Sequence, residues 1–244
     1  KVSDTTVRKH CVHIQVLLDR VGPRPRGCRE ALGLVEQAPF LQRPRKPDEP
    51  PKPSFTIDEI DAILDACQWA TVPDHDWIDP PTWWRALFIF AYNVGLRIDA
   101  IMRLEWGMIS GDRVELPGRI MKRKQGRRFP LNAAALTALG WLRGPRQMVF
   151  DWPNWPASQS YLQTCRRRIM GAAKISPQRM FGFHGFRRRY LTEIAKLNAS
   201  AAAIAAGHTN PQTVLAYYVG HEELLQSTQA AIPQPKWVRD QQKE

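Results

Sequence analysis

The sequence predicts a mainly α-helical protein with a small antiparallel β-sheet. Apolar residues recur at helical spacing over residues 4–21 and again over 57–67, which is typical of helices that bury one face. Residues 83–94 are almost all apolar and indicate a buried helix. Residues 114–131 differ, because short β-type segments flank a polar turn at 123–126 and predict a hairpin.

The composition indicates a folded protein with a polyanionic partner. The 244 residues include 35 Lys and Arg against 23 Asp and Glu, which gives a net charge of +12. Such an excess favours nucleic acid as the partner, and an ordinary basic surface is the alternative. A hydrophobic content of 43% argues against disorder. The longest apolar run, residues 86–92, is far too short to span a bilayer, so no membrane association is expected.

The cysteines indicate a reducing compartment, and we therefore expect a cytoplasmic protein. They have no C-x-x-C spacing and lie at Cys11, Cys28, Cys67 and Cys165. His10 and His13 flank the first of them at a spacing that matches no standard zinc site, so no metal is expected. The chain begins with Lys1 in place of Met, which is typical of a fragment of a longer protein.

A proline-rich segment divides the chain. Residues 42–54 hold five prolines and almost no apolar side chain, which is typical of a semi-extended linker. Its basic residues are available to contact phosphates: Arg43, Arg45, Lys46 and Lys52. We therefore expect a small helical unit at 1–41 and a larger domain at 55–244.

The larger domain begins with a capped helix and continues to a buried helix that an arginine follows. Thr56 and Glu59 have the spacing of a capping box. Gly95 and Arg97 come directly after the apolar run. An arginine in this place either projects into a site or caps the last carbonyls of the helix before it.

The predicted hairpin region is strongly basic. Six positive charges fall within ten residues, namely Arg119, Lys122, Arg123, Lys124, Arg127 and Arg128. We expect these side chains to contact phosphates, with a merely solvated hairpin as the alternative. Beyond the hairpin the pattern predicts a helix at 133–142, a short strand at 147–150 and a helix at 158–170. Arg166, Arg167 and Arg168 of that helix are expected to face outward, as DNA contacts or as a solvated face.

The stretch 184–217 predicts two helices, a turn and a third short helix. Phe186, Tyr190 and Ile194 share one helical face, and His184 and Arg187 lie together at its rim. An alanine-rich helix at 199–206 ends at a glycine, and an Asn-Pro pair at 210–211 starts the next helix.

These motifs resemble the C-terminal half of the catalytic domain of the tyrosine recombinase (phage integrase) family. The resemblance rests on His184-x-x-Arg187, on Gly207-His208 and on Tyr217, nine residues after that histidine. It covers roughly residues 55–220. It implies a mostly α-helical catalytic domain with a small antiparallel sheet. Residues 1–41 would be part of the N-terminal core-binding (DNA-clamp) domain, and an ordinary helical hairpin that packs on the main domain is the alternative.

Two upstream features extend the resemblance. Arg97 matches the family's first arginine motif, and alignment on Pro130-Leu131 places the hairpin's catalytic lysine at Lys122. A one-residue bulge would move that role to Lys124. The family usually has an acidic residue three positions after the first arginine, whereas this chain has Ala100; Asp99 could substitute only in part.

The resemblance implies the chemistry of the site. The implied catalytic residues are Arg97, Lys122, His184, Arg187, His208 and Tyr217. Tyr217 would attack a phosphodiester and form a 3′-phosphotyrosyl intermediate, with Tyr218 as the rival nucleophile. The cations would take the place of a metal, so no metal, ATP or other cofactor is expected. The implied DNA contacts are Arg119, Arg123, Lys124, Arg127, Arg128 and Arg188.

We therefore expect a site-specific DNA recombinase or integrase that acts on double-stranded DNA. Relaxation of DNA like that of a type IB topoisomerase, or DNA binding with impaired catalysis, are the alternatives. The family implies a homotetramer on DNA and a nucleoid-associated, cytoplasmic protein. The tail after Tyr217 either docks on a neighbouring subunit through Leu224, Leu225 and Ile232 or packs in cis.

Overall fold

The structure is a computed structural model. It describes residues 2–22, 31–37, 39–42, 44, 53–120, 126–198, 201, 205, 229 and 231–241. The chain divides into two compact units, residues 1–52 and 53–244, and the division falls within the proline-rich segment 42–54. Each unit is described by itself.

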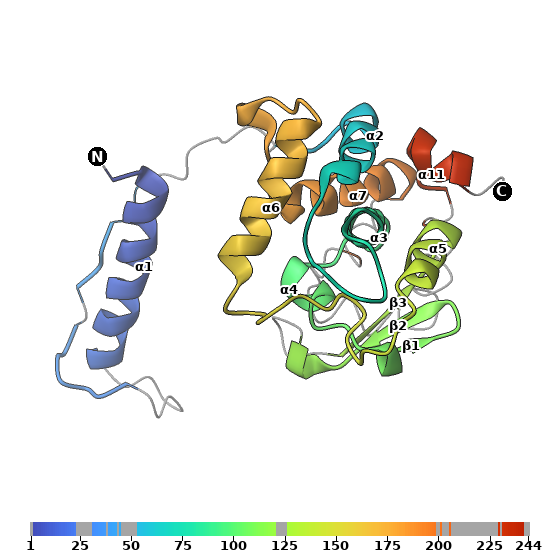
Figure 1. Cartoon of the computed structure of the whole chain (residues 1–244). Helices are drawn as coiled ribbons and strands as arrows, with labels where there is room; N and C mark the ends of the chain where they lie inside the picture. Colours follow the sequence, from blue (N-terminus) through green and yellow to red (C-terminus); the bar gives the residue numbers. More distant parts are fainter. Residues whose placement is uncertain are drawn as a thin grey trace. The chain divides into compact units, whose positions relative to one another are not determined.

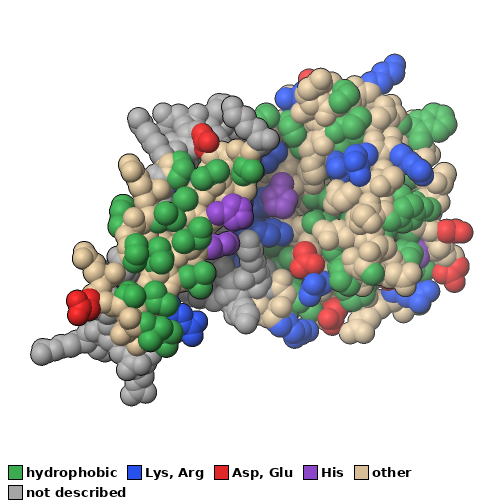
Figure 2. Space-filling view, turned by 90° about the vertical axis from the view of Figure 1, so that its left-hand side faces the viewer, with side chains coloured by type: hydrophobic (Ala, Val, Ile, Leu, Met, Phe, Trp, Pro, Cys, Tyr) green, Lys and Arg blue, Asp and Glu red, His purple; other side chains and the backbone are tan. Residues whose placement is uncertain are grey.

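The first unit consists of one helix and a returning segment. Helix α1 (Asp4–Val21) begins at Ser3, whose hydroxyl accepts a hydrogen bond from the Thr6 amide. Residues 31–44 run back beside it (Figure 1). Gln15 of α1 binds this segment to the helix, because its side chain accepts a hydrogen bond from the Leu41 amide at 2.7 Å and donates one to the Pro39 carbonyl at 3.3 Å. Hydrophobic side chains lie on the exposed surface of the helix (Figure 2), including Val7, Ile14 and Leu17.

The second unit is mainly α-helical, as the sequence predicts. Its helices are α2 (Ile57–Ala66), α3 (Pro80–Val94), α4 (Ile98–Ile101), α5 (Ala133–Trp141), α6 (Gln159–Ala172), α7 (Phe183–Leu197) and α11 (Lys236–Gln241). Short 3-10 helices join them, namely η1 (Cys67–Trp69), η2 (Trp106–Met108), η3 (Gly118–Ile120) and η4 (Pro177–Arg179).

Helix α3 is the centre of this unit. Asp79 caps its first turn by accepting from the Thr82 amide at 2.9 Å, and prolines occupy the first two helical positions. Every residue from Trp83 to Val94 except Arg85 is buried. Helices α5 and α7 pack against α3, which Figure 1 shows nearly end-on among its neighbours. The uniformly apolar sequence of α3 follows from this position, because a helix surrounded by others must be apolar on all sides.

The small sheet has three antiparallel strands in the order β1 (Ile109–Ser110), β2 (Arg113–Leu116) and β3 (Arg127–Pro130). Strands β2 and β3 are the arms of the predicted hairpin, and residues 121–125 between them lie outside the described residues. The expected strand at 147–150 does not form; Met148 makes only an isolated bridge to Glu105. The predicted fold class, mainly α with a small antiparallel sheet, is confirmed.

One expectation for α6 is wrong. Arg166 does not face outward with its two neighbours, because its side chain is only 4% exposed. It donates to the carbonyl of Phe181 and to the Gln163 side chain. Burial lowers the pKa of its guanidinium to about 10. Arg167 and Arg168 are exposed, as expected.

The described part of the C-terminal tail packs on its own chain. Ile232 is buried, and the Tyr92 hydroxyl donates to the Pro233 carbonyl at 2.7 Å. Both oxygens of the Asp61 carboxylate accept backbone amides at the start of α11, each at 3.0 Å. Of the two alternatives for the tail, packing in cis therefore holds for Gln229 and residues 231–241. Leu224 and Leu225 lie outside the described residues.

Candidate active site

The site begins at the turn that ends α3. Gly95 has φ +63°, in the left-handed region that glycine adopts without strain. A Cβ at this position would lie 2.1 Å from Cδ1 of Tyr190 on α7, so the backbone passes directly against that ring. Arg97 follows two residues later and immediately precedes α4. The first arginine is therefore carried on a turn whose path depends on close contact with α7.

A hydrogen bond joins this turn to the His-x-x-Arg motif. Nη1 of Arg187 donates to the carbonyl of Gly95. The sequence left open whether Arg97 caps the last carbonyls of the buried helix, and the structure gives this bond to Arg187. The side chain of Arg97 forms no hydrogen bond or ion pair with the part of the chain that the structure describes, whereas its backbone carbonyl accepts from the amides of Ala100 and Ile101.

Burial and like charges shift the pKa of Arg187. The pKa of its guanidinium is lowered to about 10, mainly by burial and then by the charge of Arg97; Tyr190 acts in the opposite direction, and the charge of Arg127 also lowers the pKa. The two predicted arginines are thus close enough to repel each other. Two guanidiniums held together in this way suit a ligand with two anionic oxygens.

His184 lies in the first turn of α7, one turn before Arg187, and its side chain is exposed. Its pKa is lowered, first by partial burial of the ring and then by the charges of Arg187, Arg188 and Arg97. A lowered pKa favours the neutral imidazole near pH 7, which is able to accept a proton. The charges that shift the pKa of His184 are all those of arginines.

The position where the family usually has an acid is apolar and buried here. Ala100 is 5% exposed. Asp99 does not compensate for it, since its carboxylate pairs with Nε of Arg103 at 3.1 Å. The first arginine therefore lacks a carboxylate partner within the described chain, and the site is more positive than it would be with one.

Two of the predicted DNA contacts, Arg127 and Arg128, lie on opposite faces of the sheet because they are consecutive residues of β3. Arg128 lies opposite Glu115 and forms an ion pair with it at 2.9 Å. Arg127 lies opposite Leu116, on the sheet face of the buried Phe129. The charge of Arg127 lowers the pKa of Arg187, so the two guanidiniums lie within electrostatic range of each other.

The remaining predicted contacts have protein partners or lie outside the described residues. Nη2 of Arg119 is 3.7 Å from Oε1 of Glu105. Nε of Arg188 donates to the Pro53 carbonyl at 3.0 Å, and its guanidinium lies over the Phe181 ring at 5.4 Å. Arg123 and Lys124 fall in the undescribed hairpin turn.

Three of the six predicted catalytic residues, Lys122, His208 and Tyr217, also lie outside the described residues, as does the rival Tyr218. The described residues on either side of His208 and Tyr217 are anchored in the core: Ala205 is 4% exposed and Gln229 is 2% exposed. Nε2 of Gln229 donates to the Asn93 carbonyl at 2.7 Å, two residues before Gly95.

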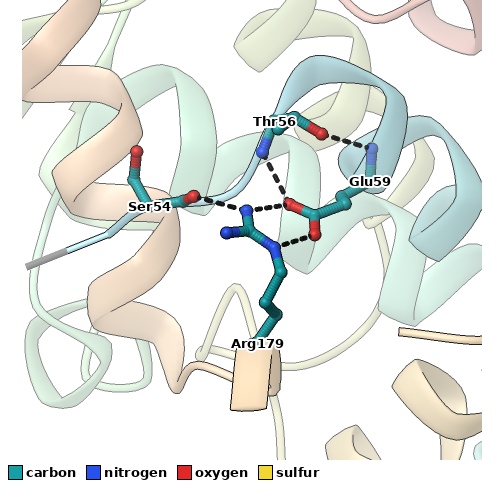
Figure 3. Close-up of polar contacts among 4 residues, drawn as sticks. All are labelled: Ser54, Thr56, Glu59 and Arg179. Carbon is teal, nitrogen blue, oxygen red and sulfur yellow. Dashed lines mark hydrogen bonds and ion pairs between the residues drawn. The ribbon is translucent and has the colours of Figure 1, made fainter. Parts of the chain in front are cut away.

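Sequence reasoning missed an ion pair near the start of α7. Arg179 binds the carboxylate of Glu59 through Nε and through Nη2, the latter at 2.6 Å, and it donates to the Ser54 carbonyl at 2.9 Å (Figure 3). The capping box revealed the local role of Glu59, whose carboxylate also accepts from the Thr56 amide. Nothing local indicates its partner, which is 120 residues away.

Within the described ranges, no group of three or more His, Cys, Asp or Glu side chains is arranged to hold a metal ion. The described helices are also too short or too polar for any of them to cross a membrane.

Comparison with known proteins decides the family. The model of the "Phage integrase family" matches residues 53–223, which is more than half of the chain. The chain belongs to the phage integrase family. The family match begins at the first residue of the second unit, and it spans every residue of the predicted catalytic set. The predicted membership of the tyrosine recombinases, or phage integrases, is thereby confirmed.

Among solved structures, one described as "Crystal structure of XerA recombinase" is similar to this integrase-family chain. The two share 14% sequence identity with a TM-score of 0.47, over 90% of this chain and 76% of the other. No curated protein matches the sequence.

Proposed function

We propose that this phage integrase family member is a site-specific recombinase that cleaves and rejoins double-stranded DNA through a phosphotyrosyl intermediate. The observation that carries the proposal is the meeting of Arg97, His184 and Arg187 around Gly95. Their charges act on one another, because Arg97 and Arg187 lower the pKa of His184 and Arg97 lowers the pKa of Arg187. Such a site suits a phosphodiester, whose transition state places negative charge on its two non-bridging oxygens.

In the proposed reaction the Tyr217 hydroxyl oxygen attacks the phosphorus and the P–O5′ bond breaks. The phenolic proton passes to the neutral imidazole of His184, and Lys122 gives a proton to the departing 5′ oxygen. Arg97, Arg187 and His208 hold the non-bridging oxygens. The DNA is joined to the tyrosine through its 3′ phosphate, and attack by a 5′-hydroxyl reverses the steps. The ester conserves the energy of the broken bond, so rejoining requires no ATP.

The test is a DNA duplex nicked close to the cleavage point, so that the short 5′-hydroxyl fragment diffuses away and the covalent adduct accumulates. We expect an adduct that survives denaturing electrophoresis and forms equally in the presence of EDTA. Tyr217→Phe should abolish it, because the substitution removes only the attacking oxygen. The matched control is Tyr218→Phe, which should form the adduct at the wild-type rate. An adduct in Tyr217→Phe would refute the assigned nucleophile.

A second candidate, DNA binding with impaired catalysis, is favoured by Ala100 and by the pairing of Asp99 with Arg103. It predicts specific binding without any adduct. Relaxation of a supercoiled plasmid that lacks the recognition site would instead indicate activity like that of a type IB topoisomerase.

The proposed assembly is four copies on two paired sites, in the cytoplasm and on the nucleoid. Sedimentation of the protein with duplexes carrying the site should show a complex of four protomers and two duplexes. A complex of one protomer on one duplex at saturating protein would contradict this assembly.

A further inference from the structure

We propose that Phe181 is a positioning residue for His184: held by three arginines, it fixes the first turn of α7 and thereby the place of the imidazole ring. This inference rests on the proposed function, since it concerns a residue of that same site.

The first turn of α7 lacks the usual side-chain cap. Its N-cap residue is Gly182, which has no side chain to cap the helix. His184 lies only two residues further on, so it is carried by this uncapped turn. An uncapped helix end leaves backbone amides without partners and frays readily. The turn must therefore be held from outside the helix.

Phe181 supplies that restraint through its backbone and its Cβ. The chain reverses sharply at Met180, where the Phe181 amide donates to the Arg179 carbonyl at 2.7 Å. The Phe181 carbonyl accepts from the buried Arg166 of α6. Its Cβ would lie 2.8 Å from a Cβ added at Gly185, so it lies directly against the turn that carries His184.

The ring of Phe181 is held on several sides. The guanidiniums of Arg179 and Arg188 each lie 5.4 Å from its centroid. The ring of Phe55 lies 5.3 Å from it and also contacts the Gly185 position. Cation–π contacts of this kind are favourable where the guanidinium is held in place.

The arginines are themselves fixed by the segment at which the second unit begins. Arg179 binds Glu59 and the Ser54 carbonyl, and Arg188 binds the Pro53 carbonyl. Arg188 was predicted from the sequence as a DNA contact, and its bonds here give it a role within the protein. A planar, charged side chain is suited to donate to a carbonyl and lie on a ring at the same time.

The test measures two quantities separately: the pKa of His184, which reports the surroundings of its ring, and the rate of catalysis. The pKa of His184 is followed by NMR of its ring protons in the free protein, with His184→Gln used for assignment. Single-turnover adduct formation is followed on the nicked duplex at saturating protein. We expect Phe181→Leu to raise the pKa of His184 toward its ordinary value, because the ring becomes more solvated among the same charges of Arg97, Arg187 and Arg188. Adduct formation should slow by about 10-fold or more, since small displacements of a catalytic group are costly.

The matched control is Phe150→Leu. Phe150 is fully buried and packs on Phe90 and Trp83, so its loss lowers stability as well. We expect a lower melting temperature in this variant, with the pKa of His184 and the adduct rate unchanged below that temperature.

Arg188→Lys keeps the charge near His184 but removes the planar guanidinium, so it serves as a milder variant should Phe181→Leu not fold. It should slow adduct formation and leave DNA affinity within about 2-fold of the wild type. If Arg188 were only a phosphate contact, lysine would replace it and both the adduct rate and the affinity would stay unchanged. An unchanged His184 pKa and an unchanged adduct rate in Phe181→Leu, or in Arg188→Lys if the first variant does not fold, would overturn the proposal. If the wild-type protein forms no adduct, the proposed function fails and the NMR titration alone decides the positioning role.

Discussion

Arg187 donates a hydrogen bond to the carbonyl of Gly95, and this bond joins two of the predicted catalytic motifs, 92 residues apart. Tyr190, one turn later on α7, covers the same glycine with its ring. The turn that carries Arg97 is therefore set by the helix that carries His184 and Arg187.

Gly95→Ala should destabilise the protein and abolish adduct formation. The added methyl group would lie 2.1 Å from the Tyr190 ring on a backbone with φ +63°. Left-handed strain and overpacking each cost about 1–3 kcal/mol, so we expect a loss of at least about 2 kcal/mol in the free energy of unfolding. Urea denaturation measures it.

Gly111→Ala is the control for that change. Gly111 has φ +57°, but a Cβ there would meet nothing within 4 Å. It should therefore cost only the backbone strain, about 1 kcal/mol, and leave the adduct rate unchanged. Equal losses in the two variants would show that contact with Tyr190 is unimportant.

Ala100→Asp should accelerate adduct formation. It places a carboxylate where the family usually has an acid, three positions after Arg97, whose side chain has no hydrogen bond or ion pair to the described residues. A fixed partner would hold the guanidinium in place for the phosphate, and we expect a gain of up to about 10-fold in single-turnover rate. Ala100→Asn has nearly the same shape without the charge and should give no gain. A slower Ala100→Asp variant would mean that the site works best without the acid.

Glu59→Gln should lower stability at neutral pH and have less effect in acid. The hydrogen bond from Arg179 is the main cause that lowers the pKa of Glu59, against the opposing effect of burial. Because its folded-state pKa lies below the unfolded value, its stabilising contribution is complete above the unfolded pKa and disappears as the pH falls through the folded one. We expect a difference of about 1–2 kcal/mol in the free energy of unfolding at pH 7.

Denaturation of the wild type and of Glu59→Gln over a series of pH values measures this difference. It should stay constant from pH 7 to about the ordinary carboxyl pKa and shrink below it. A difference independent of pH down to pH 3 would show that the ion pair contributes nothing through the charge of Glu59.

Arg127→Gln should weaken DNA binding more than Arg128→Gln does. Arg127 lies within electrostatic range of Arg187, whereas Arg128 lies on the opposite sheet face and is paired with Glu115. DNA affinity of the wild type should fall steeply with salt, and loss of one phosphate contact should reduce the slope of log affinity against log salt by about 0.9. Titrations between low and moderate salt measure both slopes. The same slope change in the two variants would contradict the assignment of the sheet faces.

Local patterns in the sequence were enough to predict several elements of the fold. The Thr56 and Glu59 capping box, the apolar run of α3 and the alternation around the hairpin each depend on residues within a few positions of one another. Helix and strand periodicity are properties of such short stretches, so the class of fold and the family motifs could be predicted without a structure.

The prediction that Arg166 points outward was wrong, because a run of three arginines in the sequence is typical of a solvent-exposed helix face. One of them in fact reaches a carbonyl 15 residues away. The expected strand at 147–150 is reduced to an isolated bridge between Met148 and Glu105, because backbone hydrogen bonds join the segment to residues 104–106 only at Gln147 and Val149.

By itself the sequence determined the main helices of the described residues, the two strands of the hairpin, the family and the candidate residues, because these follow from spacing along the chain. Only the tertiary structure decided that Arg187 donates to Gly95, that Arg128 on the face opposite Arg127 pairs with Glu115, and that Phe181 is flanked by Arg179 and Arg188. These contacts join residues from different elements. Tertiary packing brings the partners together, and a pattern over neighbouring positions in the sequence carries no information about that packing.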